Sequence, residues 1–362
     1  MKLHLIFVGN KFVCSSSLKE YILRKIEQKM DFIDSITYFK EGDNSIFLSL
    51  EEELNSCENI IIVTTKQNSP TIGKLICTVT SDNQILQNGM LLPQKCSIFQ
   101  ERSYLLEYKN SIINLIQIDE NESMPCILMQ NKTSREIVHI FDLSRDVAST
   151  LLNPIAQTYN VQISLVQEVQ GWLQIDISSS KYGDIANFIN AAKQLLPQQF
   201  IADSNIAKYI IKRLSLAQKK VTFAESCSGG LLAYYFTKNN GASNILNGSL
   251  VTYSNELKEN WLAVSHKILQ KYGAVSKEVV SEMSQGALDV SGADYAISIS
   301  GIAGDSGGTK QKPVGTVCIG VRSKNRSLEE HVLFDGDRNY VQSQSVLYAL
   351  KMLLLIDKDV FF

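Results

Sequence analysis

Short apolar runs of strand length alternate with longer helical stretches along roughly the first third of the chain. Strands that are interleaved with helices predict an α/β sheet whose strands are mostly parallel. The stretch 94–129 contains several short apolar runs but no clear period, so the pattern assigns no element to it. The elements expected in this first zone are residues 2–8, 16–30, 35–38, 49–57 and 59–64.

The pattern changes between residues 135 and 200, where a small α+β module is predicted. Leu173, Ile175 and Ile177 alternate with polar residues, which is typical of a half-buried strand. A helical stretch precedes this strand, and Pro154 is expected to kink that helix or to end it early. The expected elements are helices at 142–159 and 182–195 and paired strands at 161–167 and 171–178.

The remaining zone, residues 203–362, is again predicted to be α/β, with most of the unusual residues in the loops between elements. A helix at 205–218 and a buried strand at 220–223 lead into a turn that holds two serines and two glycines. The chain shows no internal repeat. The other expected strands are 247–252, 295–300, 315–322 and 331–334, and the other expected helices are 256–264, 277–291 and 340–355.

Length and composition narrow the class of protein. A chain of 362 residues, 44% of them hydrophobic, is globular and exceeds one comfortable core, so two or three domains are expected. A net charge of −2 gives no electrostatic footprint for nucleic acid or for an anionic membrane. No apolar run is long enough to span a membrane, and residues 3–8 are better interpreted as a first strand than as a secretory signal.

The cysteines and histidines indicate neither a disulfide framework nor a metal site. The seven cysteines are scattered and include no C-x-x-C pair, and the four histidines include no H-E-x-x-H pattern. We therefore expect a cytoplasmic protein, kept in a reducing compartment, that uses no metal and no other cofactor.

The turn at residues 224–230 reads AESCSGG and is the most informative stretch of the chain. It lies between a buried strand and a helix, where free backbone N–H groups and the positive helix end favour an anion. This geometry suits a serine nucleophile at Ser226 whose oxyanion is stabilised by the turn amides, and Ser228 is the alternative nucleophile. The same residues are also compatible with an ordinary serine N-cap and packing glycines.

A second segment, residues 251–258, places Lys258 in the first turn of a helix capped by Ser254 or Asn255. A partly desolvated lysine opposed by the helix dipole has its neutral form favoured, as a general base requires. Serine–lysine pairs are a known way to activate a nucleophile, and Tyr253 is placed to relay the proton. The alternative is a solvated surface lysine beside a core tyrosine.

A third segment runs from a strand into a loop with four glycines, Gly301, Gly304, Gly307 and Gly308. Such loops let backbone amides approach a ligand closely, as phosphate-binding loops do. The sequence fits neither the Walker A pattern nor G-x-G-x-x-G, and a merely flexible turn is the alternative.

From residue 222 to residue 338 the chain closely resembles the CinA C-terminal domain, the family of nicotinamide mononucleotide deamidases. The resemblance implies metal-independent hydrolysis of nicotinamide mononucleotide to nicotinate mononucleotide and ammonia, which serves pyridine nucleotide recycling. In the family pattern Ser226 is the nucleophile, and Tyr253 and Lys258 activate it. The matching strings are residues 224–230, 251–258, 272–276, 301–308 with 312–317, and 336–338.

The resemblance further implies a homo-oligomer that takes a small nucleotide substrate and binds neither nucleic acid nor a membrane. Ser228 replaces a usual Thr, and Asp305 and Ser306 stand where Pro and Gly are usual, a change that bears on the ligand contacts of the glycine-rich loop. The implied substrate-binding residues are Ser228, Gly229, Gly230, Gly301, Gly304, Gly307, Gly308, Lys312 and Arg338.

The first two zones resemble, more weakly, the rest of a full-length CinA protein. The implied fold is α/β, with two α/β domains joined by a small α+β (KH-like) module. Residues 1–133 would form a degenerate molybdopterin-binding-like domain, residues 134–202 a KH-like linker domain, and residues 203–362 the deamidase domain.

The nucleotide-site string of that first domain is altered in this chain. The family has a Gly-Gly-Leu-Gly-Pro-Thr turn followed by two aspartates, whereas residues 66–74 read KQNSPTIGK, with Gly73 and Lys74 in the places of the acidic pair. The start is altered too, because residues 9–11 read GNK where a glycine and acidic residues are usual. Close approach of a phosphate is hindered and a divalent cation loses its ligands, so we expect no ADP-ribose pyrophosphatase activity.

A hypothesis from another class is a non-catalytic scaffold or a competence-related binding protein. The altered first domain favours this alternative, whereas the presence of Ser226, Tyr253 and Lys258 together opposes it. Release of ammonia from nicotinamide mononucleotide distinguishes the two hypotheses.

Overall fold

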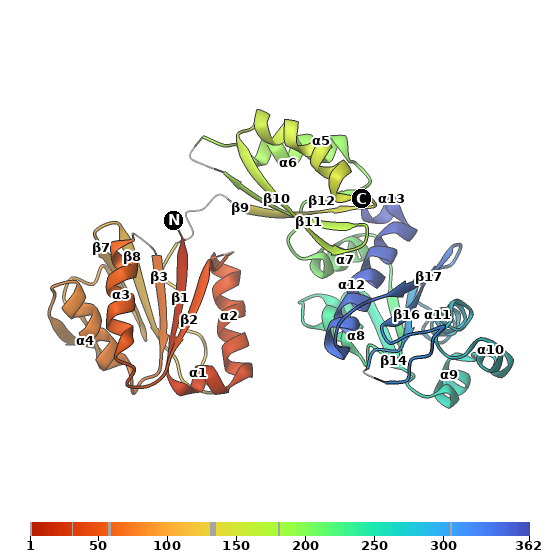
Figure 1. Cartoon of the computed structure of the whole chain (residues 1–362), viewed down its shortest axis with the longest axis horizontal. Coiled ribbons are helices and arrows are strands. Elements are labelled where there is room, and N and C mark those ends of the chain that lie inside the picture. Colours follow the sequence, from red (N-terminus) through yellow and green to blue (C-terminus); the bar gives the residue numbers. More distant parts are fainter. Residues whose placement is uncertain (1, 31, 57–58, 131–134, 180–181, 305) are drawn as a thin grey trace. The chain divides into compact units, whose positions relative to one another are not determined.

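The computed structural model describes residues 2–30, 32–56, 59–130, 135–179, 182–304 and 306–362 (Figure 1). The chain forms two compact units, Met1–Thr133 and Ser134–Phe362. Each unit combines sheets and helices, so the predicted α/β class is confirmed. Among the described residues, no helix is both long enough and apolar enough to cross a membrane.

The first unit is built on a six-stranded sheet with the order β2-β1-β3-β8-β7-β6. The first four strands pair in parallel, and β7 and β6 continue the sheet antiparallel. Neighbouring residues of a strand face opposite sides, so Ile6 packs with α3 and α4, and Phe7 packs with α1 and α2. The elements are β1 (Leu3–Val8), α1 (Asn10–Cys14), α2 (Ser16–Met30), β2 (Ser35–Phe39), α3 (Ser45–Asn55), β3 (Asn59–Thr64), α4 (Ser69–Val79), β4 (Gln84–Gln87), β5 (Met90–Pro93), β6 (Ile98–Gln100), β7 (Ser103–Tyr108) and β8 (Ser111–Gln117).

The stretch 94–129, to which the pattern assigned no element, contains β6, β7 and β8. Strands β7 and β8 form an antiparallel hairpin and are buried along most of their length on both faces. A strand covered on both faces is apolar at successive positions, so it lacks the alternation by which a half-buried strand is recognised.

The second unit begins with an antiparallel sheet of order β10-β11-β9-β12 that packs against two helices. Helix α5 runs through Pro154, so the predicted early stop is wrong. Ala148, Leu152 and Ala156 bury one face of this helix on both sides of the proline, and that burial outweighs the missing N–H. The elements are β9 (Arg135–Phe141), α5 (Arg145–Thr158), β10 (Val161–Val169), β11 (Trp172–Ser179), α6 (Ile185–Leu195) and β12 (Phe200–Ile201).

The second sheet of this unit has the order β14-β13-β15-β16-β17. Strand β13 pairs in parallel with both neighbours, which makes it the central strand of the parallel part. Phe223 packs with α7, α8 and α12 on one face, and Ala224 packs with α9, α10 and α11 on the other. The elements are α7 (Ile206–Leu216), β13 (Val221–Glu225), α8 (Leu231–Thr237), β14 (Leu246–Val251), α9 (Asn255–Leu262), α10 (His266–Tyr272), α11 (Lys277–Ser291), β15 (Tyr295–Gly301), β16 (Thr316–Ser323), β17 (Ser327–Leu333), α12 (Arg338–Ile356) and α13 (Lys358–Phe361).

The second unit contains residues of both the predicted α+β module and the predicted C-terminal domain. The division of the chain at residue 202, and with it the three-domain organisation, stays a prediction.

Candidate active site

Ser226 lies at the carboxyl end of the central strand β13, where the chain turns at once into helix α8. Its N–H donates to the carbonyl oxygen of Ile299 on the neighbouring strand β15 at 2.9 Å. The N–H of Gly229 closes the turn on the carbonyl oxygen of Ser226 at 3.1 Å. Gly230 caps α8 with a φ of 95°, a left-handed conformation that glycine adopts without strain. The predicted strand–turn–helix arrangement is therefore present, and the sheet fixes the position of Ser226.

Lys258 lies in the first turn of helix α9, which begins after the N-cap Ser254. The hydroxyl of Ser254 accepts from the N–H of Leu257 at 3.1 Å, as a serine cap does. The Lys258 side chain is 1% exposed, and this burial lowers its pKa from 10.5 to about 8. The alternative of a solvated surface lysine is thus excluded.

The Lys258 amine has three oxygen neighbours. Its Nζ lies 3.0 Å from the Ser226 hydroxyl oxygen, 2.7 Å from the carbonyl oxygen of Thr252 and 3.2 Å from that of Tyr253. An ammonium donates to all three oxygens. When the amine is neutral, the two carbonyls hold its two N–H groups, and its lone pair is left for the Ser226 O–H. The geometry therefore orients the amine for proton transfer from Ser226.

Glu225, the residue before Ser226, occupies the N-terminus of α8. Its carboxylate is fully buried and accepts from the N–H groups of Gly230, Leu232 and Ala233, each at 3.0 Å. These donors are the amides that a helix leaves unsatisfied at its N-terminus, where a negative charge is favoured. The expectation that this helix end is free to hold a substrate anion is therefore wrong, because Glu225 already fills it.

Ser228 shares the turn with Ser226 but has different neighbours. Its hydroxyl donates to Glu225 at 2.8 Å, and the hydroxyl of Ser249 donates to the same carboxylate at 3.0 Å. Three N–H groups and two hydroxyls thus surround the two oxygens of Glu225. The Ser228 hydroxyl is engaged in this network, whereas the Ser226 hydroxyl contacts the amine of Lys258. The geometry favours Ser226 over Ser228 as the nucleophile.

Tyr253 contacts Lys258 through its backbone carbonyl rather than through its phenol. The side chain is 61% exposed, and its hydroxyl accepts from Arg338 Nη1 at 3.5 Å. In the described parts of the chain, no hydrogen bond joins this hydroxyl to Ser226 or Lys258. The relay role that the resemblance assigns to Tyr253 stays a prediction.

Two glycines of the glycine-rich loop make close packing possible. A Cβ added to Gly301 would lie 2.9 Å from Cys227 Sγ, and one added to Gly304 would lie 2.3 Å from Arg338 Nη2. Gly301 therefore lets strand β15 close on the turn that carries Ser226, and Gly304 leaves room for the guanidinium of Arg338, the first residue of α12.

The outer part of this loop is exposed and includes Gly307, with a φ of 93°, and Gly308. Lys312 donates through Nζ to the carbonyl oxygen of Tyr272 at 2.6 Å, which ties the loop to the end of α10. Ser306 is exposed, and Asp305 lies outside the described residues. The structure thus places Arg338 against Gly304 and Lys312 against the end of α10, and the contacts of these residues with a substrate stay predictions.

The sequence analysis missed two residues that hold the turn, Glu225 and Gln342. Gln342, on α12, donates through its side-chain amide to the carbonyl oxygen of Cys227 at 2.7 Å. Burial raises the pKa of the Cys227 thiol to about 12, so this cysteine is not a thiolate nucleophile. A signal for Glu225 existed in its place within the turn that leads to a predicted helix, where a negative charge is favoured, whereas Gln342 comes close only through the tertiary fold.

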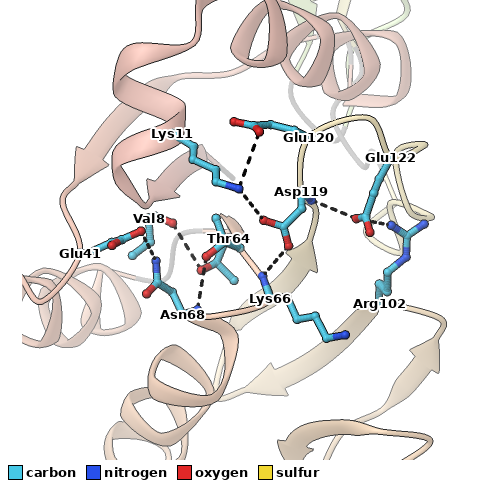
Figure 2. Close-up of polar contacts among 11 residues, drawn as sticks. Val8, Lys11, Glu41, Thr64, Lys66, Asn68, Arg102, Asp119, Glu120 and Glu122 are labelled. Carbon is cyan, nitrogen blue, oxygen red and sulfur yellow. Dashed lines mark hydrogen bonds and ion pairs between the residues drawn. The ribbon is translucent and has the colours of Figure 1, made fainter.

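Figure 2 shows the polar contacts at the carboxyl ends of β1 and β3 in the first unit. The Lys11 ammonium lies 3.4 Å from Asp119 Oδ1 and 4.0 Å from Glu120 Oε2. The other oxygen of Asp119 accepts from the Lys66 N–H at 3.0 Å, and Asn68 donates to Glu41 at 3.4 Å. Lys11 therefore pairs with acidic groups at this edge of the sheet.

Gly73 and Lys74, which stand where the family has its acidic pair, both lie within helix α4. Gly73 is buried, and a Cβ added to it would lie 2.7 Å from the side-chain amide of Gln84. Across the residues that the structure describes, no group of three or more His, Cys, Asp or Glu side chains is placed to hold a metal ion.

Comparison with known proteins finds relatives for the part of the chain that carries Ser226 and Lys258. The CinA C-terminal domain family matches residues 203–356. This part of the chain is a CinA C-terminal domain. A CinA-like protein of Prochlorococcus marinus (strain AS9601) is 38% identical over 195 residues, which is 51% of this chain and 46% of that protein. A putative competence-damage inducible protein of Thermoanaerobacter pseudethanolicus (strain ATCC 33223 / 39E) is 26% identical over 409 aligned positions and 97% of both chains.

Solved structures of the family cover the C-terminal part. The competence/damage inducible protein CihA of Agrobacterium tumefaciens is 36% identical, with a TM-score of 0.41, and the match covers 41% of this chain and 92% of that one. The match to the Prochlorococcus protein spans less than half of that relative, whereas the match to the Thermoanaerobacter protein spans nearly all of it.

Proposed function

We propose that the C-terminal part of the chain is a metal-independent amidohydrolase that converts nicotinamide mononucleotide to nicotinate mononucleotide and ammonia. The observation that carries the proposal is the buried contact between Lys258 Nζ and Ser226 Oγ at 3.0 Å. A pKa of about 8 leaves an appreciable fraction of the amine neutral near physiological pH, as a general base requires. The match to the CinA C-terminal domain and the motif resemblance supply the substrate.

In the proposed reaction, Ser226 Oγ attacks the carboxamide carbon while the neutral Lys258 amine takes the hydroxyl proton. The tetrahedral intermediate collapses as Lys258 returns that proton to the leaving nitrogen, and ammonia departs. A water molecule, deprotonated by the same amine, then attacks the acyl ester and releases the nicotinate product and free Ser226. Atoms and charges balance without a metal.

The remaining residues contribute substrate binding in this proposal. The guanidinium of Arg338 and the ammonium of Lys312 supply positive charge for the nucleotide phosphate, and the loop glycines supply backbone contacts. Ser228, Gly229 and Gly230 shape the turn beside the substrate, because the N–H groups of the two glycines are already bonded to Ser226 and Glu225. The hydroxyl of Tyr253 accepts from Arg338 at 3.5 Å, and Tyr253 keeps in this proposal the relay role that the resemblance implies. The protein acts as a cytoplasmic homo-oligomer in pyridine nucleotide recycling, without nucleic acid or membrane partners.

The test is ammonia release by the purified full chain incubated with nicotinamide mononucleotide, with product masses confirmed by mass spectrometry. We expect one equivalent each of ammonia and nicotinate mononucleotide, and no release by Ser226→Ala. A panel of other pyridine and flavin nucleotides, analysed in the same way, defines the substrate range. Absence of turnover with every nucleotide would favour the non-catalytic scaffold or competence-related binding protein.

A further inference from the structure

The peptide group between Cys227 and Ser228 is held at both ends by residues to which no role in the reaction has been given. Its carbonyl oxygen accepts from Gln342 Nε2 at 2.7 Å, and the Ser228 side chain is anchored to Glu225 at 2.8 Å. Gln342 also lies against the turn itself, since a Cβ added to Gly229 would be 3.9 Å from its Nε2. A helix distant in sequence thus fixes one peptide plane beside Ser226.

Fixing that carbonyl also fixes the direction of the Ser228 N–H. In a trans peptide the C=O and the N–H lie in one plane and point in opposite directions. The N–H of Ser228 therefore points away from Gln342. The turn is closed by the Gly229 N–H on the Ser226 carbonyl, and in such turns a serine at the first position can direct its hydroxyl toward the N–H two residues later.

Four amides of the turn and of the helix start are already engaged. Gly230, Leu232 and Ala233 donate to Glu225, and Gly229 donates to the carbonyl of Ser226. Neither the N–H of Cys227 nor that of Ser228 donates to another residue in the part of the chain that the structure describes. Of these two amides, that of Ser228 belongs to the peptide whose carbonyl Gln342 holds. A buried turn amide left with its bonding capacity free, two residues after a nucleophile, matches what an oxyanion requires.

We propose that Gln342 is a positioning residue that aims the Ser228 N–H at the oxyanion formed from the substrate carboxamide. The inference rests on the proposed amidohydrolase function and extends it to a residue outside the turn. Gln342 does not touch the substrate; it acts by holding the carbonyl of Cys227, and loss of its N–H donor lets the peptide plane rotate.

The test compares Gln342→Met, which keeps the length of the side chain but removes the donor, with Gln342→Arg, which restores an N–H donor. We expect Gln342→Met to lower kcat about 10- to 100-fold, because losing an oxyanion donor outright costs about 10²–10³. KM should stay within about twofold, because the binding residues are intact. The apparent pKa in the pH–rate profile, which reports Lys258, should not change, because the base is intact. Gln342→Arg should recover at least part of the loss.

Gln344→Met is the matched control, because this residue lies on the same helix and its side chain lines a separate cavity with Tyr348 and Lys351. It should leave kcat unchanged. Equal losses in Gln342→Met and Gln344→Met, or a rise in KM without a fall in kcat, would show that Gln342 supports the helix and not the oxyanion.

A second readout separates this inference from the choice of substrate. A fluorophosphonate reacts with an activated serine and develops negative charge on its phosphoryl oxygen, so its rate depends on Ser226, Lys258 and the oxyanion donor but not on the nucleotide. We expect Gln342→Met to slow labelling of Ser226 about 10-fold, even if nicotinamide mononucleotide is not the substrate. Unchanged labelling, or a wild-type Ser226 that does not react at all, would overturn the inference.

Discussion

The amine nitrogen of Lys258 lies 3.0 Å from the hydroxyl oxygen of Ser226, although 32 positions separate the two residues in the chain. Parallel pairing of β13 with β14 creates this contact, because Glu225 is aligned with Val251 and the Thr252 N–H donates to the Glu225 carbonyl at 2.8 Å. Ser226 directly follows β13, and the segment that leads to Lys258 directly follows β14, so both residues lie at the same edge of the sheet. The sheet, and not a flexible loop, therefore sets the distance between Ser226 and Lys258.

Replacing the two turn serines separately distinguishes their roles. Ser226→Ala should lower deamidation by at least about 10³-fold, because the attacking oxygen is lost. Ser228→Ala should keep far more activity, because the hydroxyl that it removes donates to Glu225 and not to the substrate. The measurement is kcat/KM for both variants, with circular dichroism as a control for folding. Near-normal activity in Ser226→Ala together with an inactive Ser228→Ala would reverse the assignment.

The activity should follow the protonation of Lys258. Its burial lowers the pKa to about 8, and only the neutral amine accepts the serine proton, so kcat/KM should rise with pH and level off above about pH 8. Lys258→Met should lower turnover about 10²–10⁴-fold and abolish this rise of kcat/KM with pH. A pH–rate profile of both proteins checks the expectation, and a variant with an unchanged rate would exclude Lys258 from the mechanism.

The same burial predicts a stability that rises with pH. The unfolded chain holds the Lys258 proton up to its ordinary pKa of 10.5, whereas the folded chain releases it near 8, so the unfolded state binds more protons between these values. The free energy of unfolding of the wild type should therefore gain about 2 kcal/mol between pH 7 and pH 10 relative to Lys258→Met. Urea unfolding of the two proteins at both pH values measures this difference; parallel pH profiles would show that the amine is not desolvated.

The sequence predicted the elements that carry clear local signals. Helix α11 matches its predicted range, and its N-cap Ser276 accepts from the N–H of Val279, the contact that such a pattern implies. Strand β17 is longer than predicted, since Glu329 and Glu330 lie in its middle. It is an exposed edge strand, and such strands carry charges in place of the apolar alternation that marks a half-buried one.

The sequence identified the residues of the candidate site but not the neighbours that surround them. Ser226 and Lys258 were found by their motifs, yet the burial that lowers the pKa of Lys258 and the Thr252 carbonyl that orients its amine belong to the fold. The amides expected to bind an anion are instead occupied by Glu225. The sequence shows that Glu225 precedes the helix. Only the path of the backbone shows that its carboxylate accepts from the N–H groups at the start of α8.

Glu225 should therefore be more important for stability than for chemistry. Glu225→Gln replaces one acceptor oxygen by an N–H₂ group that faces donors, and we expect a loss of about 2–4 kcal/mol in the free energy of unfolding. Ser249→Ala removes only one of the five donors and should cost about 1 kcal/mol. Urea unfolding of both variants gives the comparison. A Glu225→Gln protein as stable as Ser249→Ala would contradict the network.

The first unit should neither bind a divalent cation tightly nor hydrolyse ADP-ribose. The resemblance places Gly73 and Lys74 where the family has its acidic pair, and both lie inside helix α4. A hard cation requires carboxylate oxygens that these residues do not supply. Lys11 adds a positive charge at the end of β1, where its ammonium already pairs with Asp119.

The assay uses the full chain carrying Ser226→Ala, so that the second unit contributes no turnover, with ADP-ribose and Mg²⁺, Mn²⁺ or Co²⁺ in turn. Titration calorimetry with Mn²⁺ alone should give no tight binding, because the substitution of the acidic pair removes the ligands whether or not a substrate is present. We expect no AMP above the background with any of the metals. Release of AMP would show that this unit is an enzyme whose ligands lie elsewhere than residues 66–74.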